Sequence, residues 1–126
     1  MATTPLFTKT FDFVTWLLAA TNHFPRSQRF VVTKRLLDAA LDFQELLVDA
    51  NIRRGQARLE KLDLADAELD KVRLYLRLSF RWQWLSQGQY GHAAQQVTEI
   101  GRLLGGWKKG KGSPAAGPAG PSGDGS

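Results

Sequence analysis

The sequence predicts an all-α protein: an antiparallel four-helix bundle over residues 1–108, followed by a disordered C-terminal tail over residues 109–126. Four segments repeat apolar residues at helical spacing, and no stretch alternates apolar and polar residues as a strand would. The tail contains mainly Lys, Gly, Ser, Pro and Ala, which bury too little apolar surface to fold. A chain of 126 residues suits a single domain with a real core.

The first helix is expected to begin at Thr4 and Pro5, a capping residue followed by proline at the first helical position. A turn is expected over residues 22–25, because the residue before a proline avoids the helical region. Between these limits the apolar side chains recur at heptad-like spacing: Phe7, Phe11, Val14 and Leu18.

The second helix is expected over residues 27–50, where apolar and acidic residues occupy opposite halves of a helical projection. The apolar half consists of Phe30, Thr33, Leu36, Leu37, Ala40, Leu41, Phe43, Leu47 and Val48. The opposite half carries an acidic stripe, formed by Asp38, Asp42, Glu45 and Asp49. This pattern is typical of an amphipathic helix that lies at the surface of a bundle.

Residues 51–62 are expected to form a basic connector around Gly55, with Arg53, Arg54, Arg58 and Lys61 solvated. Asp63 is then the predicted cap of a third helix that reaches about residue 85. Residues 86–89, Ser-Gln-Gly-Gln, have the spacing of a capping box and are expected to open the fourth helix. Its apolar stripe consists of Tyr90, Ala93, Ala94, Val97, Ile100, Gly101, Leu104 and Trp107.

The third helix has apolar residues on two sides, which predicts two separate burial events. One side carries Leu69, Val72, Leu76 and Phe80, and the other carries Leu74, Tyr75, Leu78, Trp82 and Leu85. A surface helix of a monomer normally has one apolar stripe and a broad polar face. We therefore expect the second side to contact another subunit, with a fully enclosed central helix as the alternative.

A narrow basic row separates these two sides, because Arg73, Arg77 and Arg81 follow one another at intervals of four residues. Arginine is the side chain best suited to two-point contacts with phosphate and carboxylate groups. The row therefore predicts a binding surface for an anionic partner. The alternative is that the acidic stripe, or Asp66 and Asp70, neutralises the three guanidinium groups.

Two glycines of the fourth helix, Gly101 and Gly105, lie within or beside its apolar stripe, where each costs the helix roughly 1 kcal/mol relative to alanine. A position without a side chain allows a neighbour to come close, and the closer packing offsets the loss in helix propensity. We therefore expect another backbone to approach the fourth helix at these glycines.

The charge of the chain is uneven, and this favours a polyanionic partner. The net charge is +5, yet residues 1–70 carry nine Lys or Arg and ten Asp or Glu, whereas residues 71–111 carry eight Lys or Arg and one acid. A basic surface of this kind attracts nucleic acid.

The sequence does not predict an enzyme, a cofactor or a metal site. It has no cysteine, and its two histidines, His23 and His92, lack partners at ligand spacing. It has no phosphate-binding glycine loop after a strand and no nucleophile motif. No apolar run approaches the roughly 20 residues that cross a bilayer, and the N-terminus is not typical of a signal peptide, so we expect a cytoplasmic protein.

Three segments resemble the accessory variability determinant, Avd, of diversity-generating retroelements: FPRSQRF (24–30), LADAELDKVRLYLRL (64–78) and QYGHAAQQVTEIGRLLGGW (89–107). This family belongs to a wider group of four-helix bundles that includes proteins encoded in intervening sequences of ribosomal RNA genes. The resemblance covers roughly residues 5–108. It implies a bundle that assembles into a basic, pentameric barrel and binds the reverse transcriptase and template-repeat RNA of its retroelement.

The resemblance further implies a role in mutagenic cDNA synthesis and retrohoming, with Arg73 and Arg77 at the matching basic positions. From charge and location we add four residues to this predicted site: Arg81, Arg102, Lys108 and Lys109. Trp84 is the tryptophan expected nearest the basic row, either packed at an interface or stacked on a base. The alternative function is a structural homo-oligomer of the same bundle group that makes no contact with nucleic acid.

Overall fold

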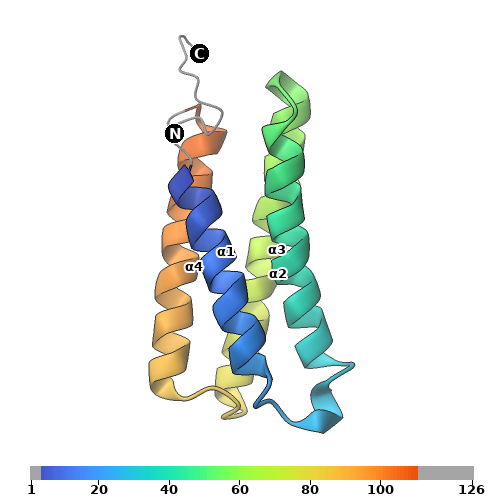
Figure 1. The fold of residues 1–126 in the computed structure, drawn as a ribbon, viewed down its shortest axis with the longest axis vertical. Coiled ribbons are helices and arrows are strands. Elements are labelled where there is room, and N and C mark those ends of the chain that lie inside the picture. The colour runs from blue at the N-terminus through green and yellow to red at the C-terminus, as the bar shows by residue number, and fades with distance from the viewer. Residues whose placement is uncertain (1–3, 111–126) are drawn as a thin grey trace.

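The computed structural model describes residues 4–110, which form four long α-helices and one short 3-10 helix (Figure 1). They are α1 (Thr4–Thr21), η1 (Arg26–Gln28), α2 (Val32–Asn51), α3 (Gly55–Arg81) and α4 (Gln87–Lys108). No strand occurs in this part of the chain, so the predicted all-α class is confirmed. Of the predicted tail over residues 109–126, residues 109 and 110 form a turn after α4, and residues 111–126 lie outside the described residues.

Consecutive helices run antiparallel, and each packs against the two helices that precede and follow it around the bundle, with α4 returning to α1. The α1–α2 and α3–α4 connections lie at one end, and the α2–α3 connection lies at the other (Figure 1). Short connections of this kind are typical of up-down-up-down bundles. The topology therefore confirms the predicted antiparallel four-helix bundle.

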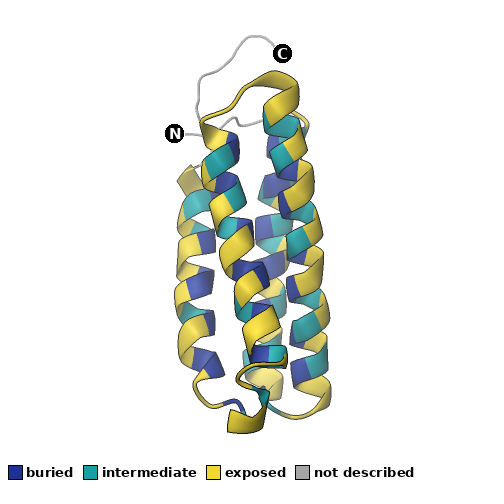
Figure 2. Ribbon diagram, turned by 90° about the vertical axis from the view of Figure 1, so that its right-hand side faces the viewer, coloured by how far each residue is buried: buried dark blue, intermediate teal, exposed yellow. Residues whose placement is uncertain are grey.

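The core is a continuous apolar cluster to which all four helices contribute one inward stripe, while their outer faces stay exposed (Figure 2). Leu17, Leu36 and Leu69 are fully buried, as are Ile100 and Leu104 from the predicted stripe of α4. The outer face of each of the four helices is exposed to solvent. The alternative in which the third helix is enclosed on all sides is therefore excluded for the protomer.

The predicted stripe of the first helix is wrong for half of its members. Phe11 is 63% exposed and Leu18 is 44% exposed, whereas Thr10 and Phe13 are buried. A helix has 3.6 residues per turn, so positions that repeat every seven residues drift around its surface. A stripe chosen by this repeat therefore included large side chains that do not face the core. The core face of α1 is instead formed by Leu6, Thr10, Phe13, Val14, Leu17, Ala20 and Thr21.

The second helix begins at Val32, not at residue 27, because residues 26–28 form the separate turn η1 after Pro25. Phe30, predicted to belong to the apolar half of the helix, lies in this connection and is 78% exposed. Thr33, Leu36, Ala40, Phe43 and Leu47 are buried as predicted.

The third helix begins at Gly55, two turns before the predicted cap Asp63. Gly55 has a positive φ of 57°, which glycine adopts readily, and this lets the chain reverse within three residues of the end of α2. Most of the predicted connector is therefore helical. Its arginines fix the junction between α2 and α3, as described below.

The same helix ends at Arg81, four residues earlier than predicted, in a Schellman motif. The amide of Trp84 donates to the carbonyl of Ser79 (2.9 Å), and the amide of Gln83 donates to that of Phe80 (2.9 Å). Gln83 occupies the left-handed position with φ 65°, where glycine is usual. The absence of glycine at this position is the reason that the sequence did not reveal the helix end.

The predicted capping box at the start of α4 is confirmed. The hydroxyl of Ser86 accepts a hydrogen bond from the amide of Gln89 (3.1 Å), and the side chain of Gln89 accepts one from the amide of Ser86 (2.8 Å). These bonds satisfy two backbone groups that a helix start leaves free.

Candidate functional site

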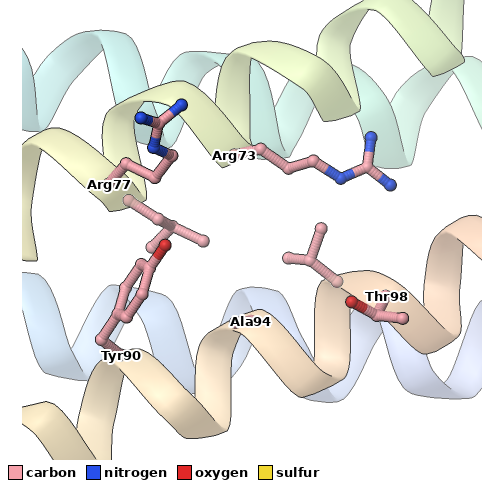
Figure 3. A pocket seen from close by; sticks show the side chains of 7 residues that line it. Arg73, Arg77, Tyr90, Ala94 and Thr98 are labelled. Atoms are coloured by element: carbon pink, nitrogen blue, oxygen red, sulfur yellow. The ribbon is translucent and has the colours of Figure 1, made fainter.

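A groove with a volume of about 170 Å³ runs between α3 and α4, with two arginines at one wall (Figure 3). Arg73 and Arg77 come from α3, and Tyr90 and Thr98 from α4 add hydroxyl groups across the groove. The remaining lining is apolar and consists of Leu76, Ala94 and Val97. Guanidinium groups beside an apolar surface are less hydrated than in open water, which strengthens their attraction to anions.

Arg73 is held by contacts on both sides. Its Nη1 lies 2.6 Å from a carboxylate oxygen of Asp70, one turn earlier on the same helix. Its Nη2 lies only 2.6 Å from the place where a Cβ atom would stand if Gly101 carried a side chain. Gly101 therefore does permit a close approach, as predicted, but the neighbour is a guanidinium group and not a backbone.

Gly105 differs from Gly101, because no neighbouring atom lies within 4 Å of the place where its Cβ would stand. The expectation that a second element approaches α4 at Gly105 is therefore wrong within the protomer.

Arg77 and Arg81 are exposed, and neither forms an ion pair with any residue from 4 to 110. The acidic stripe of α2 does not reach the basic row, so the alternative of neutralisation by this stripe is wrong. Of the two other acids in this alternative, Asp70 pairs with Arg73, and Asp66 pairs with Lys108 instead of the basic row. Arg81 is also the last residue of α3, where a positive charge interacts favourably with the helix dipole.

The remaining predicted site residues of α4 are less available to a partner. Arg102 donates two hydrogen bonds to Glu99, and these bonds raise the pKa of Arg102 and lower that of Glu99. Lys108 bridges from α4 to Asp63 (2.9 Å) and Asp66 (3.1 Å) on α3. These two carboxylates raise the pKa of Lys108.

Lys109 is exposed and forms no ion pair with the described part of the chain. The six predicted residues therefore do not form one patch. Arg73 and Arg77 line the groove, and Arg81 follows one turn later at the end of α3. Arg102 is paired with Glu99 on α4, and Lys108 and Lys109 lie at the end of the bundle opposite to Arg81, because α3 and α4 are antiparallel (Figure 1).

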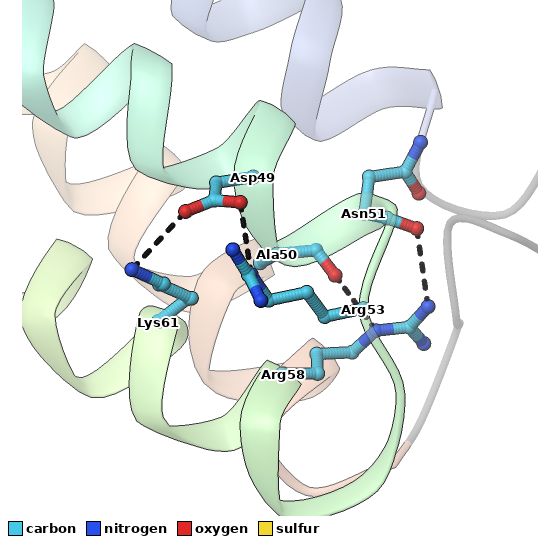
Figure 4. A network of polar contacts seen from close by, with 6 residues as sticks. All are labelled: Asp49, Ala50, Asn51, Arg53, Arg58 and Lys61. Atoms are coloured by element: carbon cyan, nitrogen blue, oxygen red, sulfur yellow. Dashed lines mark hydrogen bonds and ion pairs between the residues drawn. The ribbon is translucent and has the colours of Figure 1, made fainter.

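The face between α2 and α3 has the opposite charge. An open depression there is lined by Asp42, Glu45, Leu46, Asp49, Leu64 and Glu68. Asp49 pairs with Lys61 (3.1 Å) and Arg53 (2.9 Å), and these hydrogen bonds, that of Lys61 first, lower the pKa of Asp49 (Figure 4). The acidic flank and the basic groove thus lie on the two sides of α3.

Arg58 has a structural role that the sequence did not reveal (Figure 4). Its Nε donates to the carbonyl of Ala50 (3.0 Å) and its Nη2 to that of Asn51 (3.3 Å), so it satisfies carbonyl groups at the end of α2. The guanidinium group also lies 5.5 Å from the ring of Trp107. The expectation that Arg53, Arg58 and Lys61 are merely solvated is therefore wrong.

Trp84, predicted to lie at an interface or on a base near the basic row, packs within the protomer instead. Trp84 is half-buried and packs on Phe24, with ring centroids 5.7 Å apart. Trp82 is 63% exposed and stands directly after Arg81. Trp82, not Trp84, is thus the aromatic side chain available to a partner beside the basic row.

The second apolar side of α3 is open to solvent over much of its length. Leu74 is 55% exposed, Tyr75 and Leu78 are half-buried, and only Leu85 is buried with the core. Leu74 and Trp82 are thus the members of this side that stay exposed, whereas Tyr75 and Leu85 pack on or within the core, and contact of this side with another subunit stays a prediction.

Residues 4–110 contain no cluster of His, Asp and Glu able to hold a metal ion. The ring of His92 packs against that of Trp16, with 5.0 Å between the ring centroids. None of the helices in this range has the length and apolar character needed to pass through a bilayer.

The fold and the site together define a small antiparallel four-helix bundle with a basic groove on one side of its third helix. A family model described as bAvd-like matches residues 6–111, and the chain belongs to this family. A protein of unknown function from the S23 ribosomal protein family of Bacteroides thetaiotaomicron has a similar structure, with a TM-score of 0.75 and 23% sequence identity. The similarity covers 82% of this chain and 98% of that chain, and it shows a shared fold. No curated protein matches the sequence.

Proposed function

We propose that this protein is a non-catalytic accessory protein of a diversity-generating retroelement. In this role it binds the reverse transcriptase and the template-repeat RNA, and it supports mutagenic cDNA synthesis and retrohoming. Membership of the bAvd-like family supports the proposal at the level of the whole chain. The observation that carries it is the groove between α3 and α4, which Arg73 and Arg77 line, with Arg81 one turn further along α3 and free of ion pairs among residues 4–110.

The groove suits the phosphate backbone of RNA better than its bases. Arg73, Arg77 and Arg81 follow one another at intervals of about one helical turn. At roughly 1.5 Å per residue, their guanidinium groups are spread along about 12 Å of the helix. Contacts of this kind give affinity that depends on salt and is indifferent to sequence. Sequence selectivity then comes from the polymerase and from RNA shape.

The proposal also includes assembly of several copies of this chain into one oligomer. We expect a homo-oligomer, a pentamer by resemblance to Avd, in which the open apolar side of α3 is covered by a neighbouring subunit. A ring of several protomers repeats the same basic groove, which converts a modest individual affinity into strong binding.

The first test measures the affinity of the full chain for an RNA that carries a 5′-hydroxyl end, over a series of salt concentrations. Changing Arg73 and Arg77 together to Ala removes two phosphate contacts, so we expect weaker binding and a shallower dependence of log K on log salt, by about two units if both contacts are made. The double change of Arg35 and Arg54 to Ala is the matched control, because both side chains are exposed outside the groove and the change also removes two positive charges. Equal affinity in the wild type and in the Arg73 and Arg77 double variant would disprove the role of the groove.

The second test asks whether the same two arginines matter for the reaction. In a reconstituted system with reverse transcriptase and template RNA, the double variant of Arg73 and Arg77 should reduce cDNA synthesis, whereas the double change of Arg35 and Arg54 to Ala should not. Unchanged cDNA synthesis by a folded double variant of Arg73 and Arg77 would contradict the proposed accessory role of these residues.

The alternative is a structural homo-oligomer without contacts to nucleic acid. It is favoured by the pairing of Arg73 with Asp70, of Arg102 with Glu99, and of Lys108 with Asp63 and Asp66. This alternative predicts that the wild-type protein assembles normally but binds no RNA even at low salt, which the first test measures directly.

A further inference from the structure

A second basic pocket lies between the end of α1, η1 and the first turn of α2, and it shares no residue with the α3–α4 groove. Its volume of about 420 Å³ falls in the range of roughly 300–1,000 Å³ that is typical of small-molecule sites. Arg26 and Arg29 line the pocket, and neither forms an ion pair within residues 4–110. Two guanidinium groups without a carboxylate partner make this pocket attractive to an anion.

The pocket also reaches the start of α2, which has no side-chain cap because Val31 occupies the capping position. The first amide groups of a helix lack partners within the helix, and this end carries the positive pole of the helix dipole. A phosphate or carboxylate group at such a position is stabilised by both effects.

Thr33 gives an independent indication that this pocket takes a polar ligand. Thr33 lies in the first turn of α2 and lines the pocket, and only 9% of its surface is exposed. Its hydroxyl oxygen is itself buried and has no hydrogen-bond partner among residues 4–110. A buried hydroxyl in this state is unfavourable, and rotation about χ1 toward a bound anion would give it a partner.

The rest of the wall is largely apolar, so the ligand is expected to have a carbon-rich part as well as a charged one. Leu18, Phe24 and Leu37 contribute apolar surface. The ring of Phe24 packs against Trp84, at 5.7 Å between centroids, and the 7% of Phe24 that stays exposed is the part a ligand can contact. A rigid aromatic side chain beside two arginines is suited to a flat ring joined to a phosphate.

We propose that this pocket binds a nucleotide, with its phosphate between Arg26, Arg29 and the start of α2, and its base or sugar against Phe24. The nucleotide has two sources with the same chemistry: a free mononucleotide, or the 5′-phosphorylated end of an RNA strand. The site is separate from the groove, so it does not depend on the binding of polymerase or of internal RNA phosphates there.

The test is calorimetric titration of the full chain with four probes: AMP, inorganic phosphate, and a short oligoribonucleotide with and without a 5′-phosphate. Arg26→Ala and Arg29→Ala should each weaken binding of the nucleotide probe about tenfold or more, since each removes a charge-assisted contact. Arg54→Ala, the matched loss of one exposed arginine, should bind like the wild type, and melting temperatures of all variants establish that they are folded.

Thr33→Val gives a second measurement, because it removes the hydroxyl and keeps the shape of the side chain. Without ligand this variant should melt at a higher temperature, since the unpartnered hydroxyl is gone. Its affinity for the nucleotide should nevertheless fall about fivefold. A purely structural threonine would change the melting temperature and leave affinity unchanged, which would remove Thr33 from the site and count against the inference.

The probes distinguish the two sources. Binding of AMP supports a free nucleotide, whereas binding restricted to the 5′-phosphorylated oligoribonucleotide supports the end of a strand. The inference is overturned if no probe binds, if inorganic phosphate binds as tightly as the nucleotide probe, or if Arg29→Ala behaves like Arg54→Ala. Retained AMP binding in the Arg73 and Arg77 double variant would show that this site is independent of the groove.

Discussion

At the scale of single residues, the most informative position is Gly101, because the guanidinium group of Arg73 occupies the space that a side chain would need. A helix interior normally favours alanine over glycine by roughly 1 kcal/mol. The close contact with a residue of the predicted site gives a physical reason for glycine here. At position 101, alanine would stabilise the helix, whereas glycine leaves the space that the guanidinium group of Arg73 occupies.

We therefore predict that Gly101→Ala stabilises the fold by up to about 1 kcal/mol and weakens RNA binding severalfold, because the new methyl group displaces the guanidinium group of Arg73. Chemical denaturation and RNA titration measure the two effects. Gly105→Ala is the control: its new Cβ meets nothing within 4 Å, so stability should rise while affinity stays the same. If both variants bind RNA equally well, the position of Arg73 does not matter for binding.

At the scale of elements, some helix ends could be predicted from the sequence and others could not. The capping box at Ser86 and Gln89 was predictable, because both bonds join residues three apart in the chain. The Schellman end of α3 was not, because Gln83 stands where glycine is expected. Left-handed backbone costs a residue with a side chain roughly 1–2 kcal/mol, and tertiary packing must compensate for it.

This strain leads to a prediction for the end of α3. Gln83→Gly should raise the free energy of unfolding by about 1 kcal/mol, because glycine adopts φ 65° without steric cost and this benefit exceeds its larger loss of backbone entropy. Gln83→Ala, which also removes the side chain but keeps the strain, should leave stability nearly unchanged. Equal stability of the two variants in urea denaturation would show that the backbone of Gln83 is not strained.

The site was predictable to a limited extent, for similar reasons. The spacing of Arg73, Arg77 and Arg81 placed them on one side of α3, because a single helix determines that relation. Pairing between helices was not predictable in the same way, since Lys108 meets Asp63 and Asp66 only through the packing of α4 on α3. The cap that Arg58 provides for α2, and the pocket that Arg26 and Arg29 line, likewise depend on tertiary structure.

At the scale of the whole molecule, the exposed apolar residues of α3, Leu74 above all, are the surface at which we propose that protomers meet. We predict that the wild-type protein sediments as a homo-oligomer and that Leu74→Glu shifts it toward the monomer, because a carboxylate on this side is costly to bury between subunits. Gln95→Glu places the same charge on an exposed part of α4 and should leave the oligomer intact. A wild-type monomer at micromolar concentration, or an intact oligomer of Leu74→Glu, would place the interface elsewhere or exclude it.

The opposite charges on the two flanks of α3 also affect how a long polyanion meets the protein. Asp42 and Glu45, which have no ion-pair partner among residues 4–110, should repel a polyanion from the depression between α2 and α3, whereas Arg77 and Arg81 should attract it. If RNA binds as proposed, the strand is therefore oriented toward the arginine side of α3 before it makes contact. Lower ionic strength should accelerate association more than it slows dissociation, because this guidance acts at long range.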